Sequence, residues 1–332
     1  MQQLASEFLP WWDDAWRRLW DRHLGKTLPH AILITGGNGL GKALFACRLA
    51  RALLCARPGT DGGGCGTCSA CRMLASGAHP DLHQVTPPAD KQQIVIDQIR
   101  DLTANLEMKS HAGSFKIALI HPAERMNMAA ANSLLKTLEE PTDNTLLLLV
   151  SERPGRLPAT IRSRCQVCHL VPPATDQAKA WLENKLGGQR PVEVLLRLGA
   201  GAPLQALRLA EGDILEQRKM WIAELAAIRE DREDPVRVAA EWSAVAEKLA
   251  PLHWFGVWLA DMIRCQQAPG AKLRDPDLHD CLRTLGRSVG PATLHRLLQR
   301  VWEALRLSET ALNRQLLIED ILIDWGQAKI RG

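Results

Sequence analysis

The sequence predicts an α/β domain with a parallel sheet in the N-terminal half of the chain, followed by a region that is helical throughout. Short, mainly apolar runs occur at Ile32 to Thr35, Phe115 to Ile120 and Thr145 to Ser151. Such runs are typical of strands buried on both faces, as in a parallel sheet. A glycine-rich loop joins the first run to a helical segment, and from Asp213 onward apolar residues recur at helical spacing.

Length and composition set the broad class of the protein. A chain of 332 residues with 46% hydrophobic and 23% charged residues is typical of a globular protein and predicts roughly two or three domains. The net charge of +4 is too small to indicate a nucleic-acid-binding protein by itself. The N-terminus carries acidic residues and no apolar signal segment, and the longest aliphatic run, Leu146 to Val150, is far shorter than a membrane span. We therefore expect a cytoplasmic protein without a membrane segment.

The loop after the first predicted strand resembles a phosphate-binding P-loop. The pattern G-x-x-x-x-G-K-[ST] is met by Gly36, Gly41 and Lys42, with Gly39 as a further glycine in the loop. Ala43 stands where the pattern requires a hydroxyl group that holds Mg²⁺. The helix predicted from Lys42 to Leu54 would direct its N-terminus at an anion. The loop is thus expected to be able to hold ATP but to be poor at hydrolysing it.

The second predicted strand ends without the acidic residues of an ATPase. P-loop ATPases place an Asp here to hold Mg²⁺ and a Glu to polarise the attacking water. This sequence has His121 and Pro122 at those positions. Glu124 follows closely and is expected in the first turn of a helix, where a carboxylate is favourable. Both metal-directed positions are lost, so we expect no intrinsic ATPase activity.

A cysteine cluster follows the P-loop helix. Cys65, Cys68 and Cys71 form C-x₂-C-x₂-C, and Cys55 supplies a fourth thiol. Four thiolates at such spacing favour a structural Zn²⁺ site. An iron–sulfur cluster is the weaker alternative because no Cys-Pro completes its usual pattern, and unligated thiols remain a third possibility. The later pair at 165 and 168 favours a buried strand over a metal site.

Helical spacing and stop signals predict the remaining elements in order. Tryptophans near the N-terminus are expected to pack a short helix onto the domain. Asp97 is expected to cap a helix that ends near Met108, and Ala129 to Glu140 is expected to form a helix that stops before Pro141. The segment Val171-Pro172-Pro173 suits a linker. The closing segment, Leu312 to Trp325, is predicted to be the last helix.

Four of these features together resemble one family. They are the glycine loop GGNGLGK, the cysteine insertion, LLKTLEEP at Leu134 to Pro141, and SRC at Ser163 to Cys165. In this order they resemble the bacterial DNA polymerase III clamp loader, whose proteins are of the AAA+ class. The resemblance implies an AAA+ domain over residues 1–170 with a zinc-binding insertion at 55–71. It further implies a small helical lid over 171–212 and a helical collar over 213–332 that joins the subunits into a ring.

The departures from the family pattern imply a subunit without a motor function. The motor subunits gamma and tau keep a complete P-loop, an Asp-Glu pair after the second strand and an Arg in the lid. This chain has Ala43, His121 with Pro122, and Leu204 at the corresponding positions. The resemblance therefore implies a non-catalytic subunit that helps the complex load a sliding clamp onto primed DNA during replication. Its expected partners are gamma/tau and delta, with the clamp and DNA contacted through the complex.

The SRC motif receives a role from the same resemblance. In the family, the arginine of this motif reaches the γ-phosphate of ATP held by a neighbouring subunit. Arg164, between Ser163 and Cys165, is thus expected to act in trans as an arginine finger on a gamma/tau ATP site. A guanidinium is always charged and planar, which suits it to stabilise charge on a transferred phosphoryl group.

Two alternatives belong to other functional classes. Because Lys42 and the glycines are present, the chain could instead be a self-sufficient P-loop ATPase of the gamma/tau type acting on DNA. A zinc-dependent DNA-binding module is the second alternative. The cysteine loop does not supply the basic patch that such a module usually needs.

Overall fold

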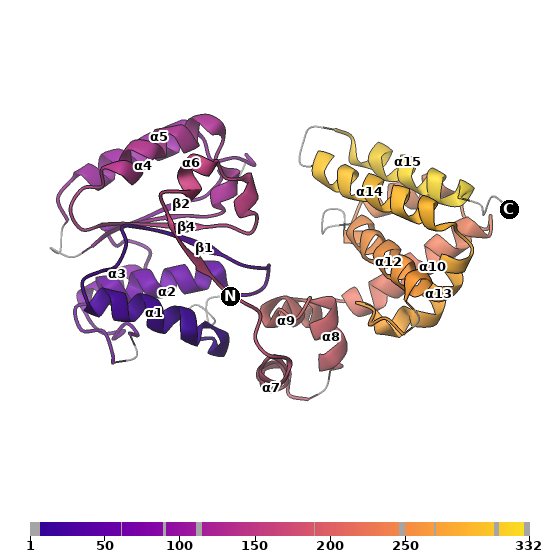
Figure 1. Ribbon diagram of the computed structural model, residues 1–332, viewed down its shortest axis with the longest axis horizontal. Coiled ribbons are helices and arrows are strands. Elements are labelled where there is room, and N and C mark those ends of the chain that lie inside the picture. Colours follow the sequence, from indigo (N-terminus) through magenta and orange to yellow (C-terminus); the bar gives the residue numbers. More distant parts are fainter. Residues whose placement is uncertain are drawn as a thin grey trace. The chain divides into compact units, whose positions relative to one another are not determined.

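The computed structural model describes residues 7–60, 62–88, 91–110, 115–188, 190–245, 250–268, 270–308 and 312–328. The chain divides into two compact units, Met1–Ala178 and Lys179–Gly332. The first unit contains a sheet covered by helices, and the second unit is built from helices (Figure 1). The predicted fold class, an α/β domain with a parallel sheet followed by helical regions, is confirmed.

The first unit is organised around a five-stranded sheet with the order β2-β3-β4-β1-β5, in which all pairs are parallel. The strands are β1 (Ala31–Thr35), β2 (Leu82–Val85), β3 (Lys116–Ile120), β4 (Thr145–Val150) and β5 (Gln166–His169). All residues of β1, β3 and β4 are buried, as their continuous apolar runs predict. β2 and β5 lie at the edges. In β5 only Cys168 is buried, so the strand predicted there exists but is mostly exposed.

Helices cover both faces of this sheet (Figure 1). One face carries α1 (Asp13–Leu24), α2 (Lys42–Leu54) and α3 (Ser69–Ala75), and the other carries α4 (Ile96–Glu107), α5 (Met128–Glu139) and α6 (Ala159–Arg162). Leu33 and Leu149 of the sheet share a buried cluster with Leu102 of α4 and Leu134 of α5. The capping prediction for α4 is wrong by two residues, because Val95 holds the N-cap position and Asp97 lies in the first turn.

The N-terminal tryptophans pack onto the glycine loop and its helix. The rings of Trp12 and Trp16 meet the ring of Phe45 in α2 edge-on, with centroid distances of 5.5 and 5.7 Å. The indole N–H groups of Trp11 and Trp12 donate to the carbonyl oxygen of Leu40, at 3.0 and 2.9 Å. The predicted packing role of these tryptophans is confirmed. Their hydrogen bonds also tie the glycine loop to the N-terminal segment.

The second unit contains helices and no strand among the residues that the structure describes. The helices are α7 (Thr175–Leu186), α8 (Val192–Leu198), α9 (Pro203–Glu211), α10 (Ile214–Arg229), α11 (Pro235–Ser243), α12 (Ala250–Gln267), α13 (His279–Arg287), α14 (Pro291–Leu307) and α15 (Arg314–Gln327). The most buried of them, α12, packs against α13 and α14. The boundary between the two units falls within α7. The finer division into a lid and a collar stays a prediction.

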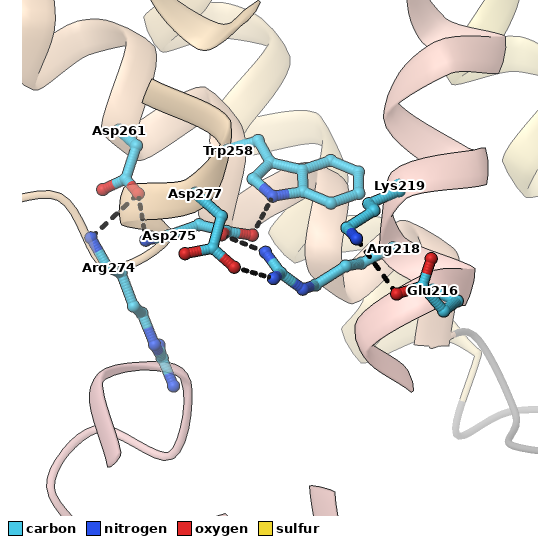
Figure 2. Close-up of polar contacts among 8 residues, drawn as sticks. All are labelled: Glu216, Arg218, Lys219, Trp258, Asp261, Arg274, Asp275 and Asp277. Atoms are coloured by element: carbon cyan, nitrogen blue, oxygen red, sulfur yellow. Dashed lines mark hydrogen bonds and ion pairs between the residues drawn. The ribbon is translucent and has the colours of Figure 1, made fainter. Parts of the chain in front are cut away.

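A buried polar network lies inside the second unit (Figure 2). Arg218 of α10 is 1% exposed and forms ion pairs with Asp275, which is fully buried, and with Asp277. The indole N–H of Trp258 donates to Asp275 at 3.1 Å. Asp261 of α12 accepts the backbone N–H groups of residues 274 and 275, at 3.0 and 3.1 Å. The network therefore joins α10 and α12 to the segment that precedes α13.

Candidate functional site

The glycine loop lies between the end of β1 and the N-terminus of α2. Gly36, Gly39 and Gly41 have φ values of 143°, 79° and 80°, which L-residues with side chains rarely adopt. A Cβ atom added at Gly36 would lie 2.5 Å from the carbonyl oxygen of Leu170. The backbone scaffold of a P-loop is therefore retained. ATP binding by this loop stays a prediction.

Lys42 is engaged by groups of the protein itself. Its ammonium Nζ donates to the carbonyl oxygen of Gly37 at 2.8 Å and lies 3.4 Å from Oε1 of Glu152. The Lys42 side chain is 4% exposed, whereas that of Glu152 is 40% exposed. Any phosphate that reaches this loop would thus compete with a carboxylate for the lysine. The P-loop pattern predicted a role for Lys42, but nothing in the sequence pattern indicated that Glu152 would lie beside it.

Polar groups gather where β3 and β4 end. The carboxylate of Glu124 accepts the backbone N–H groups of Glu152 and Arg153, at 3.1 and 3.3 Å. Glu124 lies in the first turn of the short 3-10 helix η2 (Ala123–Arg125), as predicted. Burial lowers the pKa of His121. Nδ1 of His121 and Oγ of Ser151 are buried without a hydrogen-bond partner among the residues that the structure describes. At this end of the sheet, Glu124 organises the backbone after β4.

The four predicted cysteine ligands converge. Cys55 follows α2, Cys68 caps the N-terminus of α3, Cys71 lies in its first turn, and Cys65 comes from the intervening loop. One sulfur from each lies within 4.8 Å of all the others. The Sγ atoms of Cys55 and Cys68 are 3.9 Å apart, and those of Cys65 and Cys71 are 4.0 Å apart. Tetrahedral Zn²⁺ with Zn–S bonds of about 2.3 Å requires sulfur separations of about 3.8 Å, so the residues fit a metal.

Backbone N–H groups support this sulfur cluster. Cys65 N–H donates to Sγ of Cys55 at 3.2 Å, and Cys68 N–H donates to Sγ of Cys65 at 3.4 Å. Hydrogen bonds from the Thr67 and Cys68 backbone lower the pKa of the Cys65 thiol to about 5, whereas burial raises that of Cys71 to about 12. N–H donors directed at sulfur are the arrangement expected around bound thiolates.

The SRC turn lies after α6, next to the C-terminal end of α5. Nη1 of Arg164 donates to the carbonyl oxygen of Thr160 at 3.1 Å, and Nη2 lies 2.6 Å from Oε1 of Glu139. The side chains of Arg164 and Glu139 are 37% and 49% exposed. Cys165 is buried in the same cluster as Leu134 and Leu138 of α5. The turn is thus anchored in the core while its arginine reaches the surface. Sequence reasoning missed the pairing of Arg164 with Glu139.

The structure also describes Ala43, Leu204 and the later cysteine pair, Cys165 and Cys168. Ala43 lies in the first turn of α2, directly after Lys42. Leu204 is buried in α9 and so contributes to packing. Burial raises the pKa of Cys165 and Cys168 to about 11, which favours neutral thiols. Among the described residues, the group at Cys55, Cys65, Cys68 and Cys71 is the one that could hold a metal.

The parallel sheet, the glycine loop and the helical second unit together define a P-loop protein of the AAA+ class. The model of the family "DNA polymerase III, delta subunit" matches residues 13–174, and that of "DNA polymerase III, delta subunit, C terminal" matches residues 212–327. DNA polymerase III subunit delta' of Pseudomonas aeruginosa is 35% identical over 329 residues, which cover 96% of this chain and 98% of that protein. The chain belongs to the family of DNA polymerase III delta' subunits.

Two further relatives are a second delta' subunit and a tau subunit of DNA polymerase III. Subunit delta' of Escherichia coli K12 is 32% identical over 303 residues, which cover 89% of this chain and 88% of that protein. Subunit tau of the same organism is 33% identical over 188 residues, which cover 55% of this chain and 29% of tau. The resemblance inferred from the glycine loop, LLKTLEEP and SRC is therefore confirmed. Among the helices that the structure describes, none is both long enough and apolar enough to cross a bilayer.

Proposed function

We propose that this chain is a non-catalytic subunit of a DNA polymerase III clamp loader, which helps to load the sliding clamp onto primed DNA. Gamma/tau and delta subunits would be its direct partners, and a lid (171–212) and a collar (213–332) would form its second and third domains. Two observations carry this proposal. The chain belongs to the delta' family, and Ala43 and His121 stand where a P-loop ATPase has the hydroxyl and the acid that hold Mg²⁺.

The chemistry of the glycine loop supports a role without ATP hydrolysis. Hydrolysis requires Mg²⁺ held by a hydroxyl and an acid, and Ala43 and His121 offer neither. The Lys42 ammonium lies 3.4 Å from Oε1 of Glu152, a carboxylate with which any phosphate would compete. The purified chain should therefore show no ATP turnover above background. Turnover that is abolished by Lys42→Ala would instead support a self-sufficient ATPase of the gamma/tau type.

Arg164 would act on a neighbour's ATP. Its side chain is 37% exposed and stands on a turn anchored by buried Cys165, and its guanidinium has donors left for a phosphate oxygen. An arginine finger stabilises the charge of phosphoryl transfer and is worth about 10³–10⁵ in rate in the GTPases where it has been measured. Ser163 and Cys165 would position this arginine from either side.

Reconstitution of the loader tests this role directly. Arg164→Ala should strongly depress the clamp- and DNA-stimulated ATPase of a complex assembled with gamma/tau and delta, without changing co-purification of the subunits. Arg162→Ala is the matched control, because Arg162 is an exposed arginine two residues away that makes no ion pair among the described residues. Full activity of the Arg164→Ala complex would refute the finger assignment.

The cysteine cluster would hold one structural Zn²⁺ through Cys55, Cys65, Cys68 and Cys71. Sulfur separations of 3.9 and 4.0 Å and sulfur-directed N–H groups support this part of the proposal. A bound ion would crosslink the end of α2 to α3 and fix the loop between them. Zinc has no redox chemistry and here would have no open coordination position, so its role would be structural.

A further inference from the structure

Arg164 is not an isolated surface arginine, because a carboxylate of the neighbouring helix α5 forms an ion pair with it. Glu139 is the last residue of α5, and its Oε1 lies 2.6 Å from Nη2 of Arg164. Thr160, one turn before Arg164, accepts from Nη1 at 3.1 Å. The guanidinium is therefore held from two sides, by a carboxylate of α5 and by a carbonyl of α6.

The backbone on both sides of this contact is fixed by the core. Leu138 precedes Glu139 and is 2% exposed, and Cys165 follows Arg164 and is 8% exposed. Both belong to one buried cluster, together with Ile161 of α6. The two charged side chains thus project from neighbouring anchored positions. Their pairing is a consequence of the way α5 packs against α6 rather than of chance contact between long side chains.

We propose that Glu139 is the positioning residue for Arg164: it holds the guanidinium in the orientation in which the arginine reaches a neighbour's ATP. This inference rests on the proposed finger role of Arg164. A free arginine side chain samples many rotamers, and a site in which the rotamer is already fixed loses less entropy when the transition state forms. The contact uses one edge of the guanidinium and leaves the side chain 37% exposed, so further N–H groups can face a phosphate.

The proposed role applies to Glu139 and not to Glu140, the other glutamate of the LLKTLEEP motif. Glu140 is also exposed and adjacent in sequence, but its side chain makes no ion pair among the residues that the structure describes. The two residues carry the same charge and differ in whether they contact Arg164. Glu140→Gln is therefore a control for Glu139→Gln that changes the net charge equally.

The test uses the reconstituted loader with single and double variants of this chain. Glu139→Gln should lower the stimulated kcat by up to about fivefold, since an exposed ion pair contributes at most about 1 kcal/mol. The KM for ATP should stay unchanged, because the arginine acts on the transition state. Glu140→Gln should have no effect. In an Arg164→Ala background, Glu139→Gln should cause no further loss, since there is no longer a finger to position.

Each outcome bears on a defined part of the reasoning. Loss of activity in Arg164→Ala with a wild-type kcat in Glu139→Gln would refute the positioning role and leave the finger role intact. A Glu139→Gln loss that adds in full to that of Arg164→Ala would also refute it, because Glu139 would then act elsewhere. Wild-type activity of Arg164→Ala would overturn the proposed function and this inference together. Thermal unfolding of each purified variant shows whether a loss reflects misfolding.

Discussion

Replacing Arg218 with methionine should strongly destabilise the second unit at neutral pH. The substitution keeps an unbranched, though shorter, side chain and removes the charge that faces Asp275 (Figure 2). Asp275 is 0% exposed, so water cannot replace the lost partner. After the change, the Asp275 carboxylate still accepts a hydrogen bond from the Trp258 indole N–H at 3.1 Å. Among the described residues, that indole is then its one remaining side-chain donor. Asp277 is 37% exposed and can be hydrated, so the penalty falls on Asp275.

The structure bounds the size of this effect. Removing one partner of a buried ion pair costs about 3–5 kcal/mol. Asp275 can escape that penalty by taking up a proton, which from its reference pKa of 3.8 costs about 4 kcal/mol at pH 7. We therefore expect a loss of about 3–4 kcal/mol in the free energy of unfolding. Asp275→Asn added to Arg218→Met should recover about 2 kcal/mol, because no uncompensated charge is then buried.

The destabilisation caused by Arg218→Met should also depend on pH in one direction. Burial raises the pKa of Asp275 in the folded protein above its reference value, even with Arg218 beside it. A carboxyl with a raised folded pKa stabilises the fold below its unfolded pKa and loses that contribution as pH rises through the folded value. Without Arg218 this folded pKa rises further. The deficit of Arg218→Met relative to wild type should therefore shrink as the pH is lowered from 7 towards 4.

Urea unfolding of the whole chain, followed by tryptophan fluorescence and circular dichroism, measures these changes. Arg237→Met is the matched control, because Arg237 is a half-exposed arginine paired with Glu233 and Glu241, and exposed ion pairs contribute little to stability. A destabilisation by Arg218→Met no larger than that of Arg237→Met would refute the reasoning. So would a deficit that grows as the pH falls.

Three further predictions follow from the site and the core. Cys68→Ser should lower the zinc content from about one ion per chain and should destabilise the first unit. Cys47→Ser, the control, should do neither. Metal analysis that finds iron in the wild-type protein, or full zinc in Cys68→Ser, would contradict the proposed zinc site. Glu152→Gln should tighten ATP binding by up to about fivefold in equilibrium dialysis, because the carboxylate 3.4 Å from Lys42 no longer competes with phosphate for the lysine. Equal ATP binding by the wild-type protein and Glu152→Gln would contradict this competition. Burial lowers the pKa of His121, so this residue stabilises the fold above its unfolded pKa near 6.5, and that contribution is lost as pH falls. His121→Gln should therefore flatten the acid-side decline in unfolding free energy, and an unchanged decline would contradict this prediction.

Much of the fold followed from local patterns. The three continuous apolar runs predicted β1, β3 and β4, because a strand covered on both faces shows no polar alternation. The helix predicted from Lys42 to Leu54 has those bounds as α2. β2 was not foreseen, since it is an edge strand with one buried residue and carries no apolar run. The N-cap of α4 was misplaced because Val95, with no capping side chain of its own, is supported by the Gln98 side chain.

The sequence by itself determined the chemical inventory of this protein: the glycines, Lys42, the four clustered cysteines, Arg164, and the absence of a hydroxyl and an acid at positions 43 and 121. These features are local in the chain, so the motif pattern and residue spacing indicate them, except for Arg164, which the resemblance of the SRC motif to the clamp-loader family singled out. Only the tertiary structure decided the partners of these residues. Glu139 and Arg164 are 25 positions apart and Lys42 and Glu152 are 110 apart, and they meet because helices and strands pack on one sheet. Pairings across such separations depend on three-dimensional packing, which residue spacing in one sequence does not encode.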